Sequence, residues 1–303
     1  MKRPYIALPG LLLALAGSRA AAEVPRPSED GPSTPRPIES LDGFRYHAVE
    51  IQKSLAADIV AAVGKEDGQA LTQVVKRALV WWLDPRRDLR RGDRLEMVWR
   101  SRPGLEPVVE AVWLRSEKLR ADKVAVLHRA RGASWPTWVD PERGEELERR
   151  LVDSPVQSYE QITSLLNDGR GHRGVDFKAP MGTPVVAPFA GEVVRVNWGT
   201  RSNGRCVKIV DRRRNLEALF LHLSKVDPAM KVGRRVRKGD RIGDVGNTGR
   251  SFAPHLHYQL ERAGRVVDPF RAQKSERVRL SSAEKQRAKV RLRQLEALRT
   301  TWK

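Results

Sequence analysis

The sequence predicts a mixed α+β domain, then an all-β domain of antiparallel sheet, then a C-terminal helix. Apolar residues recur at helical spacing early in the chain, short strand-like runs separated by Gly, Pro and Asn fill the middle, and helical spacing returns at the end. We therefore expect five segments, which are a signal peptide at 1–22, a proline-rich linker at 23–43, the mixed domain at 44–153, the all-β domain at 154–272 and a basic amphipathic helix at 273–303.

The N-terminus has the pattern of a secretory signal peptide. Two cations precede an apolar run from Tyr5 to about Ala16, and small residues follow up to Ala22, which is the order of charged region, apolar region and cleavage site. The run is short of the ~20 apolar residues that span a bilayer, although an uncleaved anchor is the alternative. Export places the mature chain in the periplasm. The prolines of residues 23–43 exclude a packed core there and indicate a linker.

Composition limits the classes of partner. The 303 residues suffice for two modest domains, and the formal net charge is +20. Such an excess favours nucleic acid, an acidic polymer or a membrane surface, unless it only reflects arginine-rich coding. The chain has no nucleic-acid-binding motif, and export argues against such a partner, so we expect no nucleic acid. The single cysteine, Cys206, excludes an internal disulfide.

In the mixed domain, helices are expected before strands. Ile51, Leu55, Ile59 and Val63 recur every four residues and predict a helix from Gly43 to about Val63. A second helix is expected over 71–83, stopped by Pro85, with strands at 95–99, 108–114 and 123–128 and a polar helix at 142–151.

The all-β domain is expected to contain short antiparallel strands. Asn203-Gly204 predicts a hairpin turn between two of them. The predicted strands are 183–187, 191–198, 206–211, 216–223, 241–245 and 255–261.

The basic tail allows two interpretations. Residues 271–303 hold eleven Lys/Arg and three Glu, a net of +8, and Ser281-x-x-Glu284 resembles a capping box. An apolar helical face predicts a helix docked on its own protein, while the charge predicts adhesion to an anionic envelope polymer or a membrane surface. That face is formed by Ala288, Leu292, Leu295, Leu298 and Trp302.

Four of the six histidines lie between 172 and 257. On a strand, His255 and His257 share one face while Leu256 and Tyr258 occupy the other, so two imidazoles open on one side and apolar residues pack on the other. His222 stands in an apolar run, where a packed core histidine is the alternative to a functional one.

His172 and Asp176 are separated by three residues that include Gly174, which lets the chain bend so that both side chains can converge on one ion. A catalytic zinc needs about three protein ligands and one open position. These elements therefore predict a metal site.

The sequence resembles a known family at these positions. His172-Arg-Gly-Val-Asp176, Leu221-His222-Leu223-Ser224, Gly246-Asn-Thr-Gly249 and Pro254-His255-Leu-His257 follow the order of the lysostaphin/LytM-type zinc metallopeptidases. The likeness covers roughly 171–269. Upstream segments around Trp82–Asp93 and Asp140–Val156, together with the tail helix, resemble the Gram-negative periplasmic murein endopeptidases.

The resemblance implies roles for five residues. His172, Asp176 and His257 would bind one Zn²⁺ per chain, and His222 and His255 would be catalytic histidines off the metal, with the general base unassigned between them. It implies a monomeric enzyme that cleaves peptide cross-links in peptidoglycan, at D-Ala–diaminopimelate bonds. The alternative is a non-catalytic activator or binder of cell-wall hydrolases with the same fold. In relatives of this layout the upstream domain can lie over the groove, which makes residues 44–153 a candidate regulatory domain.

Overall fold

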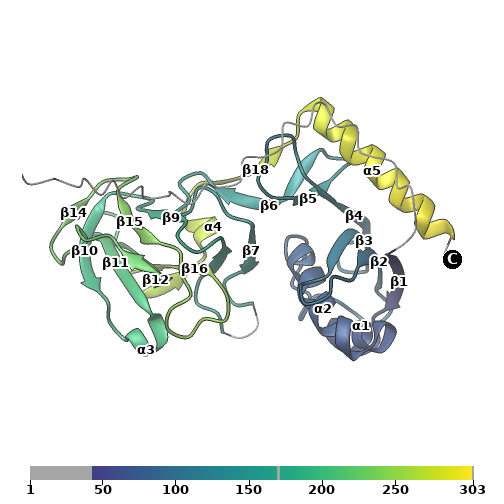
Figure 1. The fold of residues 1–303 in the computed structure, drawn as a ribbon, viewed down its shortest axis with the longest axis horizontal. Coiled ribbons are helices and arrows are strands. Elements are labelled where there is room, and N and C mark those ends of the chain that lie inside the picture. Colours follow the sequence, from purple (N-terminus) through teal and green to yellow (C-terminus); the bar gives the residue numbers. More distant parts are fainter. Residues whose placement is uncertain (1–42, 169–170, 302–303) are drawn as a thin grey trace, which may run out of the picture. The chain divides into compact units, whose positions relative to one another are not determined.

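The computed structural model describes residues 43–168 and 171–301, and antiparallel sheets organise both halves of that chain (Figure 1). The predicted signal peptide and nearly all of the predicted linker lie outside the described residues. Within the described ranges, no helix is both long enough and apolar enough to span a membrane.

Seven strands form the N-terminal sheet in the order β1-β2-β3-β4-β5-β6-β18. The first six follow one another along the chain, whereas the seventh comes from the C-terminal tail and pairs antiparallel with β6. The strands are β1 (Phe44–Glu50), β2 (Arg94–Arg100), β3 (Val108–Ser116), β4 (Ala121–His128), β5 (Thr137–Asp140), β6 (Glu145–Leu151) and β18 (Ser275–Arg279).

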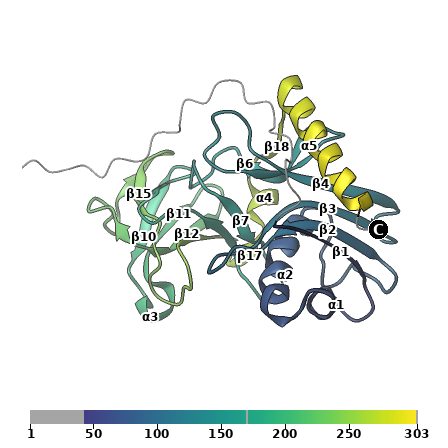
Figure 2. The ribbon, with the colours of Figure 1, turned by 45° about the vertical axis from the view of Figure 1, so that its right-hand side comes forward.

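Helices cover both faces of this sheet (Figure 2). Helices α1 (Leu55–Val63) and α2 (Lys65–Leu79) pack against Leu95, Met97 and Trp99 of β2. The intervening Val98 faces the other side, where it packs with α5 (Ser282–Thr301). The alternation of side chains along β2 thus lets one strand contribute to two cores.

Two predicted helices of this half are wrong in part or in whole. Residues 44–50 form β1 because their backbone pairs with β2, and the helix begins only at Leu55, where the Ser54 hydroxyl accepts a hydrogen bond from the Ala57 N–H at 3.2 Å. The segment expected as a polar helix at 142–151 is strand β6, between β5 and β18. Its Leu147 and Leu151 are buried, so tertiary pairing outweighs a sequence that favours a helix.

The second half holds an eight-stranded and a three-stranded sheet. The larger has the order β14-β10-β11-β12-β16-β8-β7, with β17 paired to β16, and the smaller has the order β13-β15-β9. The elements are β7 (Gln161–Ser164), β8 (Val175–Lys178), β9 (Pro184–Val186), β10 (Gly191–Val196), α3 (Thr200–Asn203), β11 (Arg205–Asp211), β12 (Leu216–Leu223), β13 (Lys225–Val226), β14 (Arg235–Val236), β15 (Arg241–Asp244), β16 (His255–Arg262), β17 (Arg265–Val267) and α4 (Pro269–Ala272).

The six strands predicted for this half are confirmed as β9, β10, β11, β12, β15 and β16. The predicted hairpin is confirmed, since the segment with Asn203-Gly204 connects the antiparallel strands β10 and β11, but the connection is longer than a two-residue turn and contains the short helix α3. Gly204 is needed for another reason, since a Cβ there would lie 2.2 Å from the Thr248 hydroxyl oxygen.

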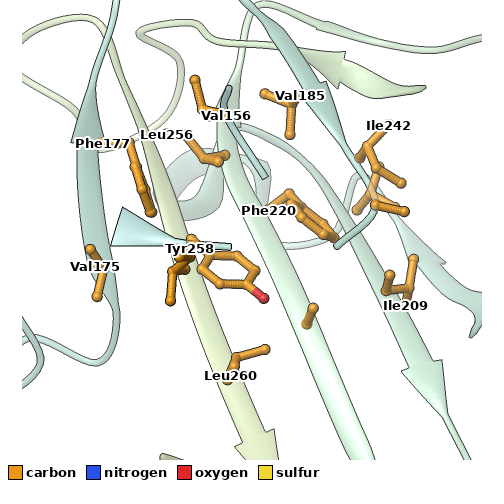
Figure 3. Packing of buried hydrophobic residues seen from close by; sticks show 14 of the residues in the cluster. Val156, Val175, Phe177, Val185, Ile209, Phe220, Ile242, Leu256, Tyr258 and Leu260 are labelled. Atoms are coloured by element: carbon orange, nitrogen blue, oxygen red, sulfur yellow. The ribbon is translucent and has the colours of Figure 1, made fainter. Parts of the chain in front are cut away.

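One face of the large sheet forms the core (Figure 3). Leu256, Tyr258 and Leu260 of β16 pack there with Phe177 and Phe220 from the flanking strands. The predicted alternation along β16 is therefore confirmed, and the opposite face of β16 carries its two histidines.

The tail belongs to the N-terminal sheet rather than standing alone. After β18, helix α5 begins where the Ser281 hydroxyl accepts a hydrogen bond from the Glu284 N–H at 3.2 Å. The Glu284 carboxylate turns to His128 instead of completing the capping box. Of the expected apolar face, Ala288 and Leu295 are fully buried, and Trp302 lies outside the described residues. Residues 152–274 are thus inserted between two neighbouring strands, β6 and β18.

Candidate active site

Strand register gathers the predicted site residues. In the ladder between β8 and β16, His257 lies directly opposite Asp176. On the other side of β16, His257 pairs with Leu221 of β12, which places the next residue, His222, beside the same point. His255 is held by a bridge to Gly246. Three adjacent strands therefore supply four of the five candidates.

Three ligand atoms converge as one zinc ion requires. His172 Nε2 lies 3.0 Å from Asp176 Oδ1 and 3.0 Å from His257 Nδ1, and the last two atoms are 2.9 Å apart. Ligand atoms at 2.0–2.1 Å from a tetrahedral zinc stand about 3.4 Å apart. The two imidazoles and the carboxylate therefore fit a metal after an outward shift of a few tenths of an ångström, and they form one triangular group among the described residues.

A backbone carbonyl orients the His172 ring. The His172 Nδ1 atom lies 3.0 Å from the Leu165 carbonyl oxygen, which can only accept, so Nδ1 carries a hydrogen and Nε2 faces the other two candidate ligands. Ser164 Oγ lies 3.1 Å from the same Nδ1 atom. Such contacts fix the tautomer of a metal-binding histidine.

The two remaining histidines have matching tautomers. His222 Nδ1 lies 2.9 Å from the Thr248 carbonyl oxygen, and His255 Nδ1 lies 2.8 Å from the Ala253 carbonyl oxygen. Both rings donate from Nδ1, which leaves Nε2 available to other partners. Their ring centroids are 4.9 Å apart, and His255 Nε2 lies 3.8 Å from Asp176 Oδ1. The two rings lie beside the triangle of candidate ligands, which is His172, Asp176 and His257, and are not part of it.

His222 also has a strained backbone. Its φ of 65° lies in the left-handed region, which non-glycine residues seldom occupy except where surrounding structure imposes it. Gly246 packs against this backbone, since a Cβ there would lie 2.1 Å from Ser224 N and 2.6 Å from the His222 oxygen. The site thus depends on a close approach between two backbone segments.

Gly174 lies at a bend and also lets two strands approach closely. Its φ lies outside the left-handed region, but a Cβ at Gly174 would lie 2.5 Å from the Tyr258 oxygen and 2.8 Å from His257 Nε2. The predicted bend between His172 and Asp176 is confirmed at residue 174. Glycine lets β8 lie against the His257 ring.

The electrostatics suit a cation. Burial by itself raises the pKa of Asp176, but hydrogen bonds from His172 and His257 outweigh burial and hold that pKa well below its usual range. Burial lowers the pKa of His172, and the Asp176 hydrogen bond and charge outweigh it and raise that pKa. An ionised carboxylate beside two imidazole nitrogens is a donor set that suits a metal cation. Burial, opposed by the Thr248 hydrogen bond, lowers the pKa of His222 to about 4.

A groove leads to this site. Its volume is about 840 Å³, and Asp176 and His255 form part of its wall. Phe252 is 94% exposed beside it. The other lining residues are Gln73, Arg77, Arg102, Leu105, Glu106, Trp135, Glu160, Thr163, Ser164, Lys178, Ala253 and Pro254.

Residues of the mixed domain therefore line part of the groove. The sequence did not predict which residues of that domain these are. The carbonyls of Leu165, Thr248 and Ala253 were missed as well, because a backbone oxygen has no sequence signature. Gly246 was part of the family resemblance, and its close packing against the His222 backbone is the physical reason for a glycine there.

Known proteins that are similar to this chain are named as peptidases. Residues 170–269 match Peptidase family M23. An uncharacterized metalloprotease of Haemophilus influenzae is 35% identical over 52% of this chain and 34% of its own length. Peptidoglycan DD-endopeptidase ShyA of Vibrio cholerae is 33% identical over 61% of this chain and 44% of its own length.

Among solved structures, a zinc-containing peptidase from Vibrio cholerae is 27% identical, with a TM-score of 0.36 over 75% of this chain and 70% of that one. The chain spans less than half the length of the first curated relatives it matches.

Proposed function

Because residues 170–269 form a domain of peptidase family M23, we propose that the chain is a zinc-dependent endopeptidase that hydrolyses peptide cross-links in peptidoglycan. The observation that supports this most is the triangle of His172 Nε2, Asp176 Oδ1 and His257 Nδ1, with sides of 2.9–3.0 Å. Curated relatives named as peptidoglycan endopeptidases support the substrate, and D-Ala–diaminopimelate is the bond we propose.

His172, Asp176 and His257 would hold one Zn²⁺. Bound there, zinc would lower the pKa of a water from about 15.7 to about 7 and polarise the scissile carbonyl. The protein supplies one negative charge to the site, so the metal site keeps a net positive charge. Strands β8 and β16 would position Asp176 and His257, the Leu165 carbonyl would orient His172, and the groove would bring the substrate to them.

Proton transfer falls to the two other histidines. His255 Nε2 lies 3.8 Å from Asp176 Oδ1, so it can accept the proton of the attacking water and later pass it to the leaving amine. His222 keeps its Nδ1 hydrogen on the Thr248 carbonyl, so it can donate to a developing oxyanion only from a protonated Nε2. Either ring can serve as the base on this geometry, and pH–rate profiles of His222→Ala and His255→Ala separate the roles.

Digestion of purified sacculi tests the function. We expect release of muropeptides that stops with a chelator and returns with added Zn²⁺, and mass spectrometry of the fragments identifies the bond cut. Undiminished release in the presence of chelator would contradict a metal-dependent peptidase. Fragments cut at another peptide bond would support the proposed peptidase activity but contradict the proposed D-Ala–diaminopimelate bond.

A non-catalytic activator of the same fold is the second candidate. Such relatives typically lack one or more of the metal ligands, whereas His172, Asp176 and His257 are all present here and adjacent. Bound zinc in purified protein supports the enzyme. Protein purified without chelators that contains no zinc and releases no muropeptides supports the activator.

The mixed domain is proposed to regulate access. Lys76 of α2 forms an ion pair with Asp168 at 3.9 Å, and Glu106 lies 3.7 Å from Lys178 at the groove. These ion contacts are partly exposed, and pairs of this kind contribute about 0–1 kcal/mol each. Breaking them with Lys76→Met and Glu106→Gln should raise activity on sacculi up to a few fold. Unchanged or lower activity in folded protein would favour wall or partner binding for this domain.

The periplasm is the proposed location. Hydrolysis of peptidoglycan requires export, and the predicted signal peptide at 1–22 provides the route. N-terminal sequencing of protein from the cell envelope tests both the export and the cleavage near Ala22. An N-terminus at Met1 would favour the uncleaved anchor.

A further inference from the structure

The excess positive charge of the chain is unevenly neutralised. In helix α5, four cations are engaged in ion pairs with carboxylates of neighbouring turns or of the N-terminal half. These cations are Arg287, Lys289, Arg291 and Arg299. The tail therefore presents less available charge than its composition suggests.

A second cationic surface lies at the far edge of the large sheet, where β14 is the last strand (Figure 1). We define the basic edge as six exposed cations, which are Arg195, Arg212, Arg213, Lys231, Arg234 and Arg235. Backbone contacts bring them together. Arg235 pairs with Glu192 of β10, and the Arg234 carbonyl accepts a hydrogen bond from the Val193 N–H at 2.8 Å.

Few carboxylates balance the basic edge. Glu192 is 3.4 Å from Arg212, and it is the only ion-pair partner of a basic-edge cation within residues 43–168 and 171–301. The nearby Asp211 and Asp227 accept hydrogen bonds from backbone N–H groups of their own turns. The other five cations face solvent.

An apolar side chain stands among these cations. Val232 is 67% exposed between Lys231 and the Arg234-Arg235 pair. Charge on an edge strand also prevents edge-to-edge pairing. That explains Arg235 but neither the exposed valine nor Arg212 and Arg213 of the β11–β12 turn. An apolar residue surrounded by cations suits a surface with anionic headgroups above an apolar layer.

We propose that the basic edge docks on an anionic phospholipid bilayer, with Val232 entering the headgroup region. The carboxylates of a peptidoglycan strand offer charge but no apolar layer for the valine. Four strand spacings of about 4.8 Å separate β14 from β16, so docking keeps the histidine site about 19 Å along the sheet from the membrane contact. The enzyme would then work on wall material while held at a membrane surface. This inference does not depend on the proposed peptidase activity.

Vesicle cosedimentation of the full chain tests the proposal. The probes are vesicles of phosphatidylglycerol with phosphatidylcholine and vesicles of phosphatidylcholine alone. We expect binding to the anionic vesicles that weakens with salt. Each basic residue near such a surface contributes roughly fivefold, so Lys231→Glu/Arg234→Glu/Arg235→Glu should weaken anionic binding at least ~100-fold. Val232→Ser should weaken it a few fold and leave its salt dependence unchanged.

The matched control removes the same charge elsewhere. Lys53, Lys65 and Lys118 are exposed cations of the N-terminal half, and their triple change to Glu should weaken binding far less. Equal losses in the two triple variants would overturn the basic edge as a specific site. So would a loss of sacculus binding with no loss of vesicle binding. The edge variant should keep the circular dichroism spectrum and the gel-filtration volume of the unchanged chain, which shows that it is folded.

Discussion

His257 lies directly opposite Asp176 across the β8–β16 ladder, with 2.9 Å between His257 Nδ1 and Asp176 Oδ1. Residues 81 positions apart in sequence are thus fixed as a cross-strand pair by backbone hydrogen bonds, before any ion is bound. The opposite faces of the same strands pack Phe177, Leu256 and Tyr258 into the core. Stability of the core and position of the candidate ligands therefore depend on the same register.

Replacing Gly174 with alanine should destabilise the protein and weaken zinc binding at the site. The new Cβ would lie 2.5 Å from the Tyr258 oxygen, a backbone atom that cannot move without shifting β16. We expect a loss of roughly 2–4 kcal/mol in the free energy of unfolding and at least tenfold less zinc binding. Denaturant unfolding and metal titration measure the two effects.

Gly132→Ala is the matched control. Its φ of 76° also strains alanine, but nothing lies within 4 Å of the new methyl group. We expect a cost of about 1 kcal/mol with zinc binding intact. Equal zinc affinity in the two variants would contradict the close-approach role of Gly174.

Thr248→Val should lower the rate and leave zinc content unchanged. The Thr248 hydroxyl donates to the Leu223 carbonyl at 2.7 Å and accepts from the Arg205 N–H at 3.0 Å, and these bonds position the Thr248 carbonyl that orients His222. Loss of such supporting contacts commonly reduces activity by about 10–100-fold. Steady-state kinetics on a soluble muropeptide and zinc analysis check this. Full activity would show that the Thr248 side chain does not position His222.

Deletion of residues 23–153 should give insoluble protein, because β18 and α5 would lose the sheet that they complete. A fragment of residues 152–274 instead removes both segments of the N-terminal half, at the junction where the Val152 N–H donates to the Lys274 carbonyl at 3.0 Å. We expect this fragment to be soluble and to cleave sacculi at least as fast as the full chain. Soluble, folded protein from the 23–153 deletion would contradict the claim that β18 and α5 need the rest of the N-terminal sheet.

Stability should fall as pH rises because of Glu148. Burial, only partly offset by the hydrogen bond from the Ile162 N–H, raises the pKa of Glu148 from 4.5 to about 7. Below pH 4.5 the carboxyl is protonated in both states. Between pH 4.5 and about 7 it ionises in the unfolded state but stays protonated in the folded state, so folding loses roughly 3 kcal/mol over that range. Glu148→Gln should remove that part of the decline between pH 4.5 and 8. Parallel stability–pH curves for the two proteins, from denaturant unfolding, would contradict the assignment.

Local pattern predicted much of the second half of the chain. Alternation along 255–261 correctly separated the core face from the histidine face, and glycine punctuation located six strands. Those signals depend on neighbouring residues alone. The residues of the metal triangle came from resemblance and spacing, and their roles remain predictions.

Long-range pairing explains most of what the sequence did not predict. Residues 145–151 have the pattern of a polar helix but form a strand because β5 and β18 flank them, and β18 is more than 120 residues away. The apolar face of the tail predicted a helix docked on its own protein, and the buried Leu295 and the ion pairs confirm it, but the N-terminal sheet as the docking partner was not predicted. Nothing in the sequence near either segment specifies its partner.

Zinc content is the most direct test of the central claim. We predict one zinc per chain in the full protein, less than a tenth of that in His257→Ala and in Asp176→Asn, and unchanged zinc in His47→Ala, whose ring contacts Trp99 far from the triangle in sequence and sheet. Elemental analysis of folded, gel-filtered protein measures all four. Full zinc occupancy in His257→Ala and Asp176→Asn would contradict the claim that these side chains hold the ion.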